Sequence, residues 1–166
     1  LGILHHLQRI GAVPGDLLIL HVAGNEQFLD AYWACIYGGI VPVPVAVGIS
    51  DEHKHKLLRI ARQLGNPLLY TDRKLHDRLA VFAAEQGEAS LASLERRTFL
   101  IDQLDDISRA GTPARVAPDQ TAFIQFSSGS TSEPKGVVLT HANLLTNMDG
   151  VTRAIGLNEH DVTLSW

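Results

Sequence analysis

The chain has little of several features that mark whole classes of protein. Among its 166 residues there is one cysteine, Cys35, so an internal disulfide is excluded and a reducing, cytoplasmic setting is expected. The 14 Lys and Arg residues do not outnumber the 18 Asp and Glu residues, and a net charge of −4 gives no case for a nucleic-acid partner. The sequence also lacks a G-x-G-x-x-G fingerprint and the Gly-Lys-Ser/Thr of a Walker loop, so two common nucleotide-binding loops are absent.

One long uncharged stretch raises the question of a membrane span. Residues 31–50 carry no charged side chain, and ~20 apolar residues are enough to cross a bilayer. However, Gly38-Gly39 and Val41-Pro-Val-Pro44 would break a helix through its middle. The stretch is therefore interpreted as a core helix ending at Gly38 and a buried strand, whose prolines place it at an edge or end of a sheet. No signal peptide is visible and no membrane span is expected.

Helix and strand patterns alternate along the chain. Short apolar runs predict strands, and apolar residues at helical spacing predict helices. Ser50 and Thr140 are expected to cap the helices that follow them. The expected strands lie at 17–22, 40–45, 68–71, 98–101 and 121–126, and the expected helices at 3–10, 28–38, 51–64, 75–86 and 144–155. Such alternation predicts the α/β class, with a mostly parallel sheet flanked by helices.

The most informative stretch is Phe126-Ser-Ser-Gly-Ser-Thr-Ser-Glu-Pro-Lys-Gly136. Residues 127–132 are all Ser, Thr or Gly, and Lys135 follows on a Pro-Lys-Gly turn. Small residues leave backbone N–H groups accessible, and a triphosphate requires many donors and a positive charge at close range. The stretch therefore predicts an exposed phosphate-gripping loop over 127–136, between a strand and a helix. The alternative is a solvated Ser/Gly linker, which the ordered flanks disfavour.

With its flanks, this stretch resembles the phosphate-binding motif of the adenylate-forming (AMP-binding) superfamily. The family pattern is Ser/Thr-Ser-Gly-Ser/Thr-Thr-Gly-x-Pro-Lys-Gly, followed by Val and by Thr/Ser-His. Here Ser127–Gly136 and Val137-Val-Leu-Thr-His141 match it, except that Ser132 stands where Gly is usual. Two further stretches, Phe28–Pro44 and Asp161–Trp166, are similar to segments of fatty acyl-AMP ligases and of lipid-loading adenylation domains of nonribosomal peptide synthetases.

The resemblance implies a reaction and its partners. It implies an acyl-AMP ligase or acyl-CoA synthetase-like ligase that uses ATP and Mg²⁺. Such an enzyme activates a carboxylic acid, here expected to be a fatty acid, to an acyl-adenylate and releases pyrophosphate. The acyl group then passes to the phosphopantetheine of an acyl or peptidyl carrier protein, or to CoA, and these residues do not decide between the two.

The resemblance also implies that residues 1–166 are an N-terminal portion of the large N-terminal domain of such an enzyme. We expect the portion to be incomplete at both ends, because the chain has no initiator Met and stops at Trp166 inside an apolar run. The family's later motifs, including its main catalytic lysine, would lie past Trp166. We therefore expect this portion alone to be inactive.

Site residues follow from the match, position by position. Lys135 is also the candidate catalytic residue, since its charge would offset that of the leaving pyrophosphate; the alternative is a solvated loop lysine. Thr131 is the candidate to approach the magnesium ion. Trp166 either lines the adenine or acyl pocket or is a plain core residue, and His141 either belongs to the motif or is a surface residue. The expected phosphate-binding residues are Ser128, Gly129, Ser130, Thr131, Ser132, Lys135 and Gly136.

Two other functions remain open at this point. One is an adenylation domain that activates an amino acid. The other is a non-catalytic anion- or protein-binding α/β module, in which the Ser/Gly stretch only caps a helix. An enzyme would have to continue with the later acidic and lysine motifs of the family, so the downstream sequence separates these alternatives.

Overall fold

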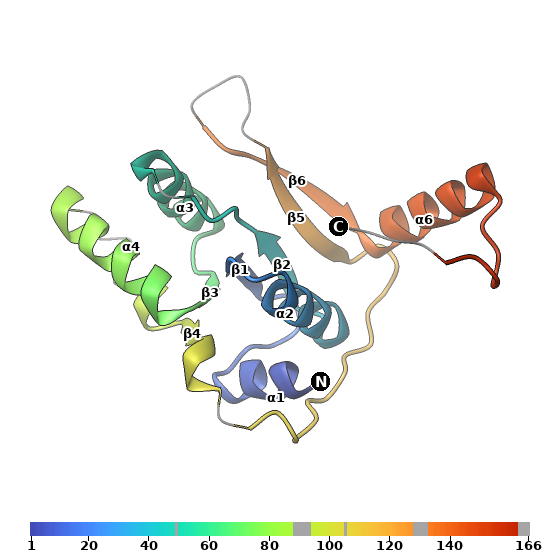
Figure 1. Ribbon diagram of the computed structural model, residues 1–166, viewed down its shortest axis with the longest axis horizontal. Coiled ribbons are helices and arrows are strands. Elements are labelled where there is room, and N and C mark those ends of the chain that lie inside the picture. The colour runs from blue at the N-terminus through green and yellow to red at the C-terminus, as the bar shows by residue number, and fades with distance from the viewer. Residues whose placement is uncertain (49, 88–93, 105, 128–132, 163–166) are drawn as a thin grey trace.

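Four short apolar runs form one parallel sheet. Figure 1 shows the computed structural model, which describes residues 1–48, 50–87, 94–104, 106–127 and 133–162. All neighbouring strands in this sheet run parallel, and their order is β2-β1-β3-β4. The strands are β1 (Leu17–His21), β2 (Val41–Pro44), β3 (Leu68–Thr71) and β4 (Thr98–Leu100), close to the predicted runs.

Helices cover both faces of the sheet, because successive strand residues point to opposite sides. Helices α3 (Asp51–Leu64) and α4 (Arg73–Gln86) bury one face, in a cluster that includes Ile19 and Leu69. Helices α1 (Gly2–Arg9) and α2 (Asn25–Gly38) bury the other, in a cluster that includes Leu18 and Tyr70. A short 3₁₀ helix, η1 (Ile101–Gln103), follows β4. The α/β prediction with a mostly parallel, helix-flanked sheet is confirmed.

The ends of the helices follow local chemistry that the sequence predicted in part. Thr140 caps α6 (His141–Ile155) as expected: its hydroxyl accepts from the Asn143 N–H, and the Asn143 side chain accepts from the Thr140 N–H. Ser50 stands at the N-cap of α3, but its hydroxyl bonds the ring Nδ1 of His53 at 2.7 Å and caps no backbone N–H. Gly87 and Gly156 end α4 and α6 in the left-handed conformation, as glycine allows at low cost.

A hairpin stands beside the parallel sheet, and the sequence predicted only half of it. β5 (Thr121–Ser127) pairs antiparallel with β6 (Lys135–Thr140). The prediction of a loop over 127–136 leading into a helix was wrong at both borders, because Ser127 ends β5 while Lys135 and Gly136 begin β6. The run Val137-Val-Leu139 is rich in β-branched residues, which suit a strand better than a loop.

Prolines keep this hairpin out of the parallel sheet. The N–H groups of Val41 and Val45 donate toward β1, to the carbonyls of Asp16 and Leu20. Backbone groups alternate sides along a strand, so the nitrogens of Pro42 and Pro44 lie on the outer edge, where they have no hydrogen to donate. β5 lies against this edge but belongs to a separate two-stranded sheet. The prediction that the prolines mark a sheet edge is confirmed.

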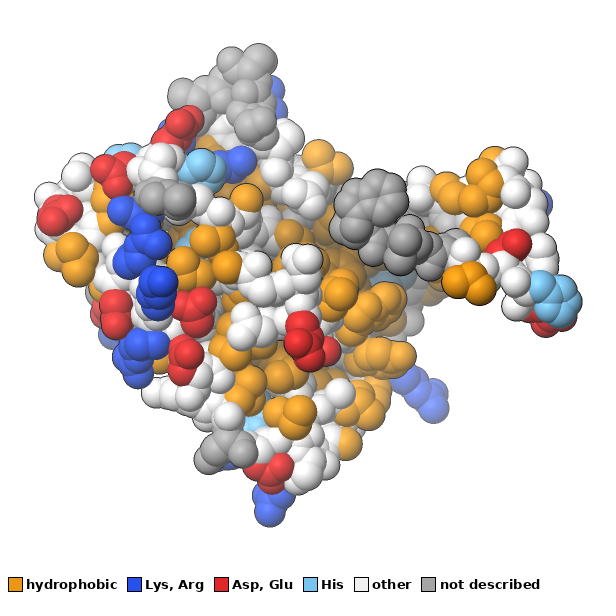
Figure 2. All heavy atoms as spheres, viewed as in Figure 1, with side chains coloured by type: hydrophobic (Ala, Val, Ile, Leu, Met, Phe, Trp, Pro, Cys, Tyr) orange, Lys and Arg blue, Asp and Glu red, His pale blue; other side chains and the backbone are white. Residues whose placement is uncertain are grey.

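Two helices carry large apolar side chains on their outer faces. On α2 the buried residues are small, whereas Leu29, Trp33 and Tyr37 are exposed, Trp33 by 53%. The interpretation of α2 as a core helix therefore holds for one face only. On α6, which projects from the body in Figure 1, the stripe that includes Met148 and Ile155 is exposed as well. Figure 2 shows hydrophobic side chains on α6 and over the centre of the view, where α2 faces the reader.

No helix in the described part of the chain is long and apolar enough to cross a membrane. The uncharged stretch over 31–50 divides between α2 and β2, as its glycines and prolines predicted.

Candidate functional site

The mouth of the hairpin brings Ser127 and Lys135 together. They are opposite each other in the β5–β6 register, and the Ser127 hydroxyl donates to the Lys135 carbonyl at 3.5 Å. Lys135 is exposed, and no ion pair among the described residues engages its ammonium group. An exposed cation is thus fixed at the base of the Ser/Thr/Gly stretch, where it is available to an anionic ligand.

Next to Lys135, Gly136 is exposed on strand β6, and one side of it lies against the Phe126 ring. It is opposite Phe126, which belongs to the cluster under α3 and α4. A Cβ atom at position 136 would lie 3.1 Å from Cζ of Phe126 and 3.2 Å from Cγ2 of Ile124. Gly136 was expected to bind phosphate, and the structure gives it a packing role that holds whether or not it also touches a ligand.

A cavity of about 260 Å³ lies beside the end of β5. The carboxyl end of β2, the side of α3 that faces β5, and residues Gln125 and Phe126 line it. Its rim carries Glu52, His53 and Lys56, while Val45 and Ile60 contribute apolar surface. On the same helix, Arg59 and Arg62 border a second hollow together with Glu133, which leads into Lys135. The α3 side of the hairpin mouth therefore carries three cationic side chains together with the carboxylates of Glu52 and Glu133.

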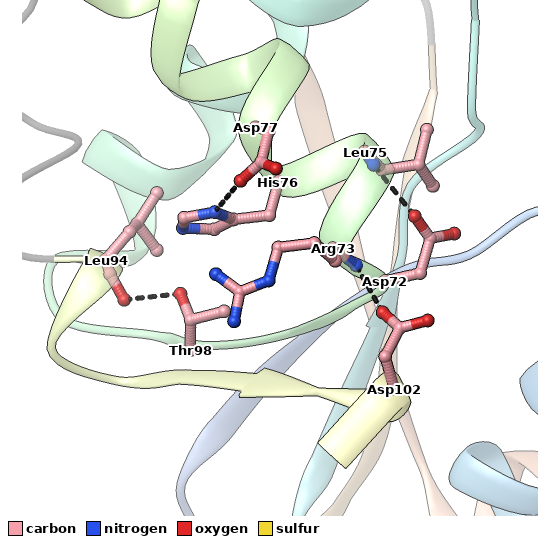
Figure 3. A network of polar contacts seen from close by, with 8 residues as sticks. All are labelled: Asp72, Arg73, Leu75, His76, Asp77, Leu94, Thr98 and Asp102. Atoms are coloured by element: carbon pink, nitrogen blue, oxygen red, sulfur yellow. Dashed lines mark hydrogen bonds and ion pairs between the residues drawn. The ribbon is translucent and has the colours of Figure 1, made fainter.

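Elsewhere along the carboxyl edge of the sheet, two aspartates serve the fold. Figure 3 shows Asp72 accepting from the Leu75 N–H at 2.8 Å, which caps α4, and Asp102 accepting from the Arg73 N–H. These contacts fasten the start of α4 to η1. They leave the hairpin mouth, with Lys135, and the neighbouring cavity, with Lys56, as parts of this edge whose lysines have no ion pair among the described residues.

Sequence reasoning missed a pair of polar residues at the ends of the two central strands. His21 and Thr71 are opposite each other in the β1–β3 register. In the described part of the chain, His21 Nδ1 and Thr71 Oγ1 are buried with no hydrogen-bond partner. Burial lowers the pKa of His21 to about 4, against a smaller opposing effect of Asp72, so the ring is neutral near pH 7. A histidine that ends an otherwise apolar run, Leu17–Leu20, is the signal that was available in the sequence.

The other predicted site residues divide into two groups. His141 is partly buried as the first residue of α6, next to its capping threonine. The remaining residues lie outside the described part of the chain, and their roles stay predictions: Ser128, Gly129, Ser130, Thr131, Ser132 and Trp166.

Comparison with known proteins decides the family. The model of the family described as "AMP-binding enzyme" matches residues 4–166. The chain belongs to this family. Relatives of this chain include a 4-hydroxyphenylalkanoate adenylyltransferase of Mycobacterium tuberculosis, 29% identical, with 83% of this chain and 22% of the relative aligned. A long-chain fatty acid–AMP ligase of Mycolicibacterium smegmatis is 28% identical, with 92% of this chain and 24% of the relative aligned.

Solved structures agree with the family assignment. McyG A-PCP complexed with phenylalanyl-adenylate is similar with a TM-score of 0.85 and 30% identity, over 99% of this chain and 30% of that one. The chain thus spans about a quarter of the curated relatives it matches, 27% of the first and 22% of the next. The predicted membership of the adenylate-forming superfamily is confirmed.

The described residues fit a polyphosphate ligand better than they fit a metal. The exposed Lys135 supplies positive charge next to a hydroxyl, and Lys56 on α3 lines the cavity beside the end of β5. In contrast, no cluster of three or more His, Cys, Asp or Glu side chains suited to a metal ion occurs among the described residues. A magnesium ion that arrives with the phosphates needs few protein ligands, and Thr131 stays its predicted contact.

Proposed function

We propose that the complete protein activates a carboxylic acid with ATP to give an acyl-adenylate. A carboxylate oxygen bonds to the α-phosphorus, the bond to the β-phosphate oxygen breaks, and pyrophosphate leaves. The observation that carries this proposal is the exposed Lys135, fixed opposite Ser127 in a chain that belongs to the AMP-binding enzyme family. The proposal extends from the described residues to Ser128–Ser132 as the loop that holds the phosphates.

Charge placement is the chemical contribution of this part of the protein. Displacement at phosphorus depends mainly on positioning and on stabilising negative charge on the departing oxygens. Lys135 meets both needs, because its backbone is fixed by the β5–β6 register and no ion pair among the described residues engages its ammonium group. Magnesium would neutralise phosphate charge when it is bound with the nucleotide.

For the substrate we propose a fatty acid, supported by the resemblance of Phe28–Pro44 to fatty acyl-AMP ligases and by the aligned fatty acid–AMP ligase. An aromatic or amino acid is a second candidate, favoured by a specific finding. The 30% identical solved structure holds phenylalanyl-adenylate, and another relative is named for 4-hydroxyphenylalkanoates. We propose a carrier-protein phosphopantetheine as the acceptor, with CoA as the alternative.

ATP–pyrophosphate exchange in the complete protein tests the reaction. Fatty acids of several chain lengths, arylalkanoic acids and amino acids are supplied one at a time with MgATP and labelled pyrophosphate. We expect fatty acids to give the highest exchange. Exchange with amino acids alone would overturn the lipid assignment and keep the family reaction, whereas absence of exchange with every acid would overturn adenylation itself.

A further inference from the structure

The β5–β6 pair contains one contact that links the core to the candidate phosphate site. Gly136 is opposite Phe126 in the antiparallel register, and Lys135 directly precedes Gly136. The position that a Cβ atom would take at 136 is 3.1 Å from Cζ and 3.2 Å from Cε1 of Phe126. The backbone that carries Lys135 therefore rests on the edge of this ring.

The ring itself has little freedom. Phe126 is 9% exposed and belongs to the buried cluster that includes Val45 and Ile60. Ile124, whose Cγ2 atom flanks the same space at 3.2 Å, is β-branched and stiff at χ1. On the other side of Lys135, Pro134 is buried. The exposed lysine thus stands between a buried proline and an exposed glycine that lies against the Phe126 ring.

We propose that Phe126 is the positioning residue for Lys135: its ring supports Gly136 from below and so sets the height of the Lys135 backbone over the core. Gly136 is required because only a residue without a side chain allows β6 to approach the ring this closely. The proposal rests on the proposed function for its consequence in ATP binding, but the contact itself can be measured without any turnover.

Substitutions at positions 136 and 126 should shift strand β6 in opposite directions. A methyl group at position 136 must displace the ring, Ile124 or strand β6 by a few tenths of an ångström, since 3.1 Å is too short for carbon atoms. Shortening Phe126 to leucine removes the support and lets β6 settle toward the core. In the double variant, the methyl group added at position 136 fills space left by the lost ring. The effects of the two changes on the position of β6 should therefore compensate.

The test uses the complete protein with Gly136→Ala, Phe126→Leu, the double variant and the control Phe82→Leu. Phe82 is 3% exposed in the same buried cluster but lies on α4, against His55 and Lys54, away from the hairpin. Its truncation lowers stability in a comparable way without touching β6. The measurements are the Kd of MgATP by calorimetry, the KM and kcat of exchange, and the melting temperature.

We expect Gly136→Ala and Phe126→Leu each to weaken MgATP binding roughly tenfold, since small misplacements of a binding group are amplified. The double variant should bind within about threefold of wild type, as expected for coupled rather than independent sites. Phe82→Leu should lower the melting temperature and leave the Kd of MgATP unchanged.

Three results would overturn the inference: wild-type MgATP affinity in Gly136→Ala, simple multiplication of the two effects in the double variant, or an equal loss of affinity in Phe82→Leu. Failure of the proposed function is recognised separately. A wild-type protein that binds MgATP but exchanges no pyrophosphate with any acid would refute adenylation, and the four Kd values would still decide on Phe126. A wild-type protein that does not bind MgATP would overturn both proposals.

Discussion

His21 should make the protein sensitive to acid, and replacing it with phenylalanine should remove that part of the sensitivity. Burial at the end of β1 lowers the pKa of His21 from 6.5 to about 4, while the Asp72 carboxylate acts weakly in the other direction. Between these two pH values the unfolded chain binds a proton at this position and the folded chain does not. His21→Phe keeps a ring in the site but has no group to protonate.

The sign and size of the effect follow from linkage. Because the unfolded state binds more protons in this window, the free energy of unfolding rises with pH. The contribution of His21 is present in full above pH 6.5 and is lost as the pH falls toward 4. The interval between the two pKa values, at about 1.4 kcal/mol per pH unit, amounts to about 3 kcal/mol. That is a large share of a typical stability of about 5–15 kcal/mol.

Urea unfolding at neutral pH and near pH 4 measures this difference in the complete protein. Wild type should lose about 3 kcal/mol more than His21→Phe over that interval. His160→Phe is the control, since His160 is 87% exposed, and it should lose as much as wild type. If His21→Phe and wild type lost the same free energy of unfolding, burial of a neutral His21 would not contribute to the acid sensitivity, and the argument would be wrong.

Substitutions at two further positions and one labelling experiment test other parts of the structure. Lys135→Ala should slow pyrophosphate exchange roughly ten- to a hundredfold, as expected for losing one charge-assisted contact, with an unchanged melting temperature; wild-type exchange would make it a solvated lysine. Thr140→Ala should lower the free energy of unfolding by about 1 kcal/mol, because it removes the hydroxyl that accepts from the Asn143 N–H. Thr140→Ser keeps a hydroxyl and should keep that stability. Equal stability of the two variants in denaturant unfolding would contradict the cap. Burial raises the pKa of the Cys35 thiol, so a thiol reagent should label it only after unfolding, and rapid labelling of the native protein would show that Cys35 is accessible.

Much of the fold could be predicted because the spacing of apolar residues, and the glycines and prolines that end helices and strands, are local properties of the sequence. Leu68–Thr71 is a strand with the predicted bounds, and Gly87 and Gly156 end helices where they were expected to. Strand β6 was not predicted because Pro134-Lys-Gly136 is a typical turn sequence, whereas Lys135 and Gly136 begin the strand. A helical period also does not say what covers the apolar stripe, and Ile155 on α6 is 66% exposed.

The residue types of the candidate site could be predicted, but the core side chains that pack against them could not. The motif identified Lys135 and Gly136, yet it gave no reason for the glycine beyond access to phosphate. That reason requires the β5–β6 register, which brings Phe126 under Gly136 from ten positions away. His21 and Thr71 escaped for the same reason, because their pairing depends on β1 and β3 being neighbours in the sheet.

The alternate prolines of β2 have a consequence for protein engineering. Main-chain hydrogen bonds fix the register of two strands, whereas side-chain packing fixes only shape and tolerates volume-conserving replacement. The hairpin adjoins β2 and α2 through side chains such as Phe126 and Phe123, the latter with its ring centroid 6.0 Å from that of Tyr32. A hairpin from a related enzyme would therefore have to reproduce these apolar contacts, but it would not have to match a hydrogen-bond ladder. We therefore expect that strands β5 and β6 can be exchanged for those of a related enzyme without rebuilding the sheet beside them.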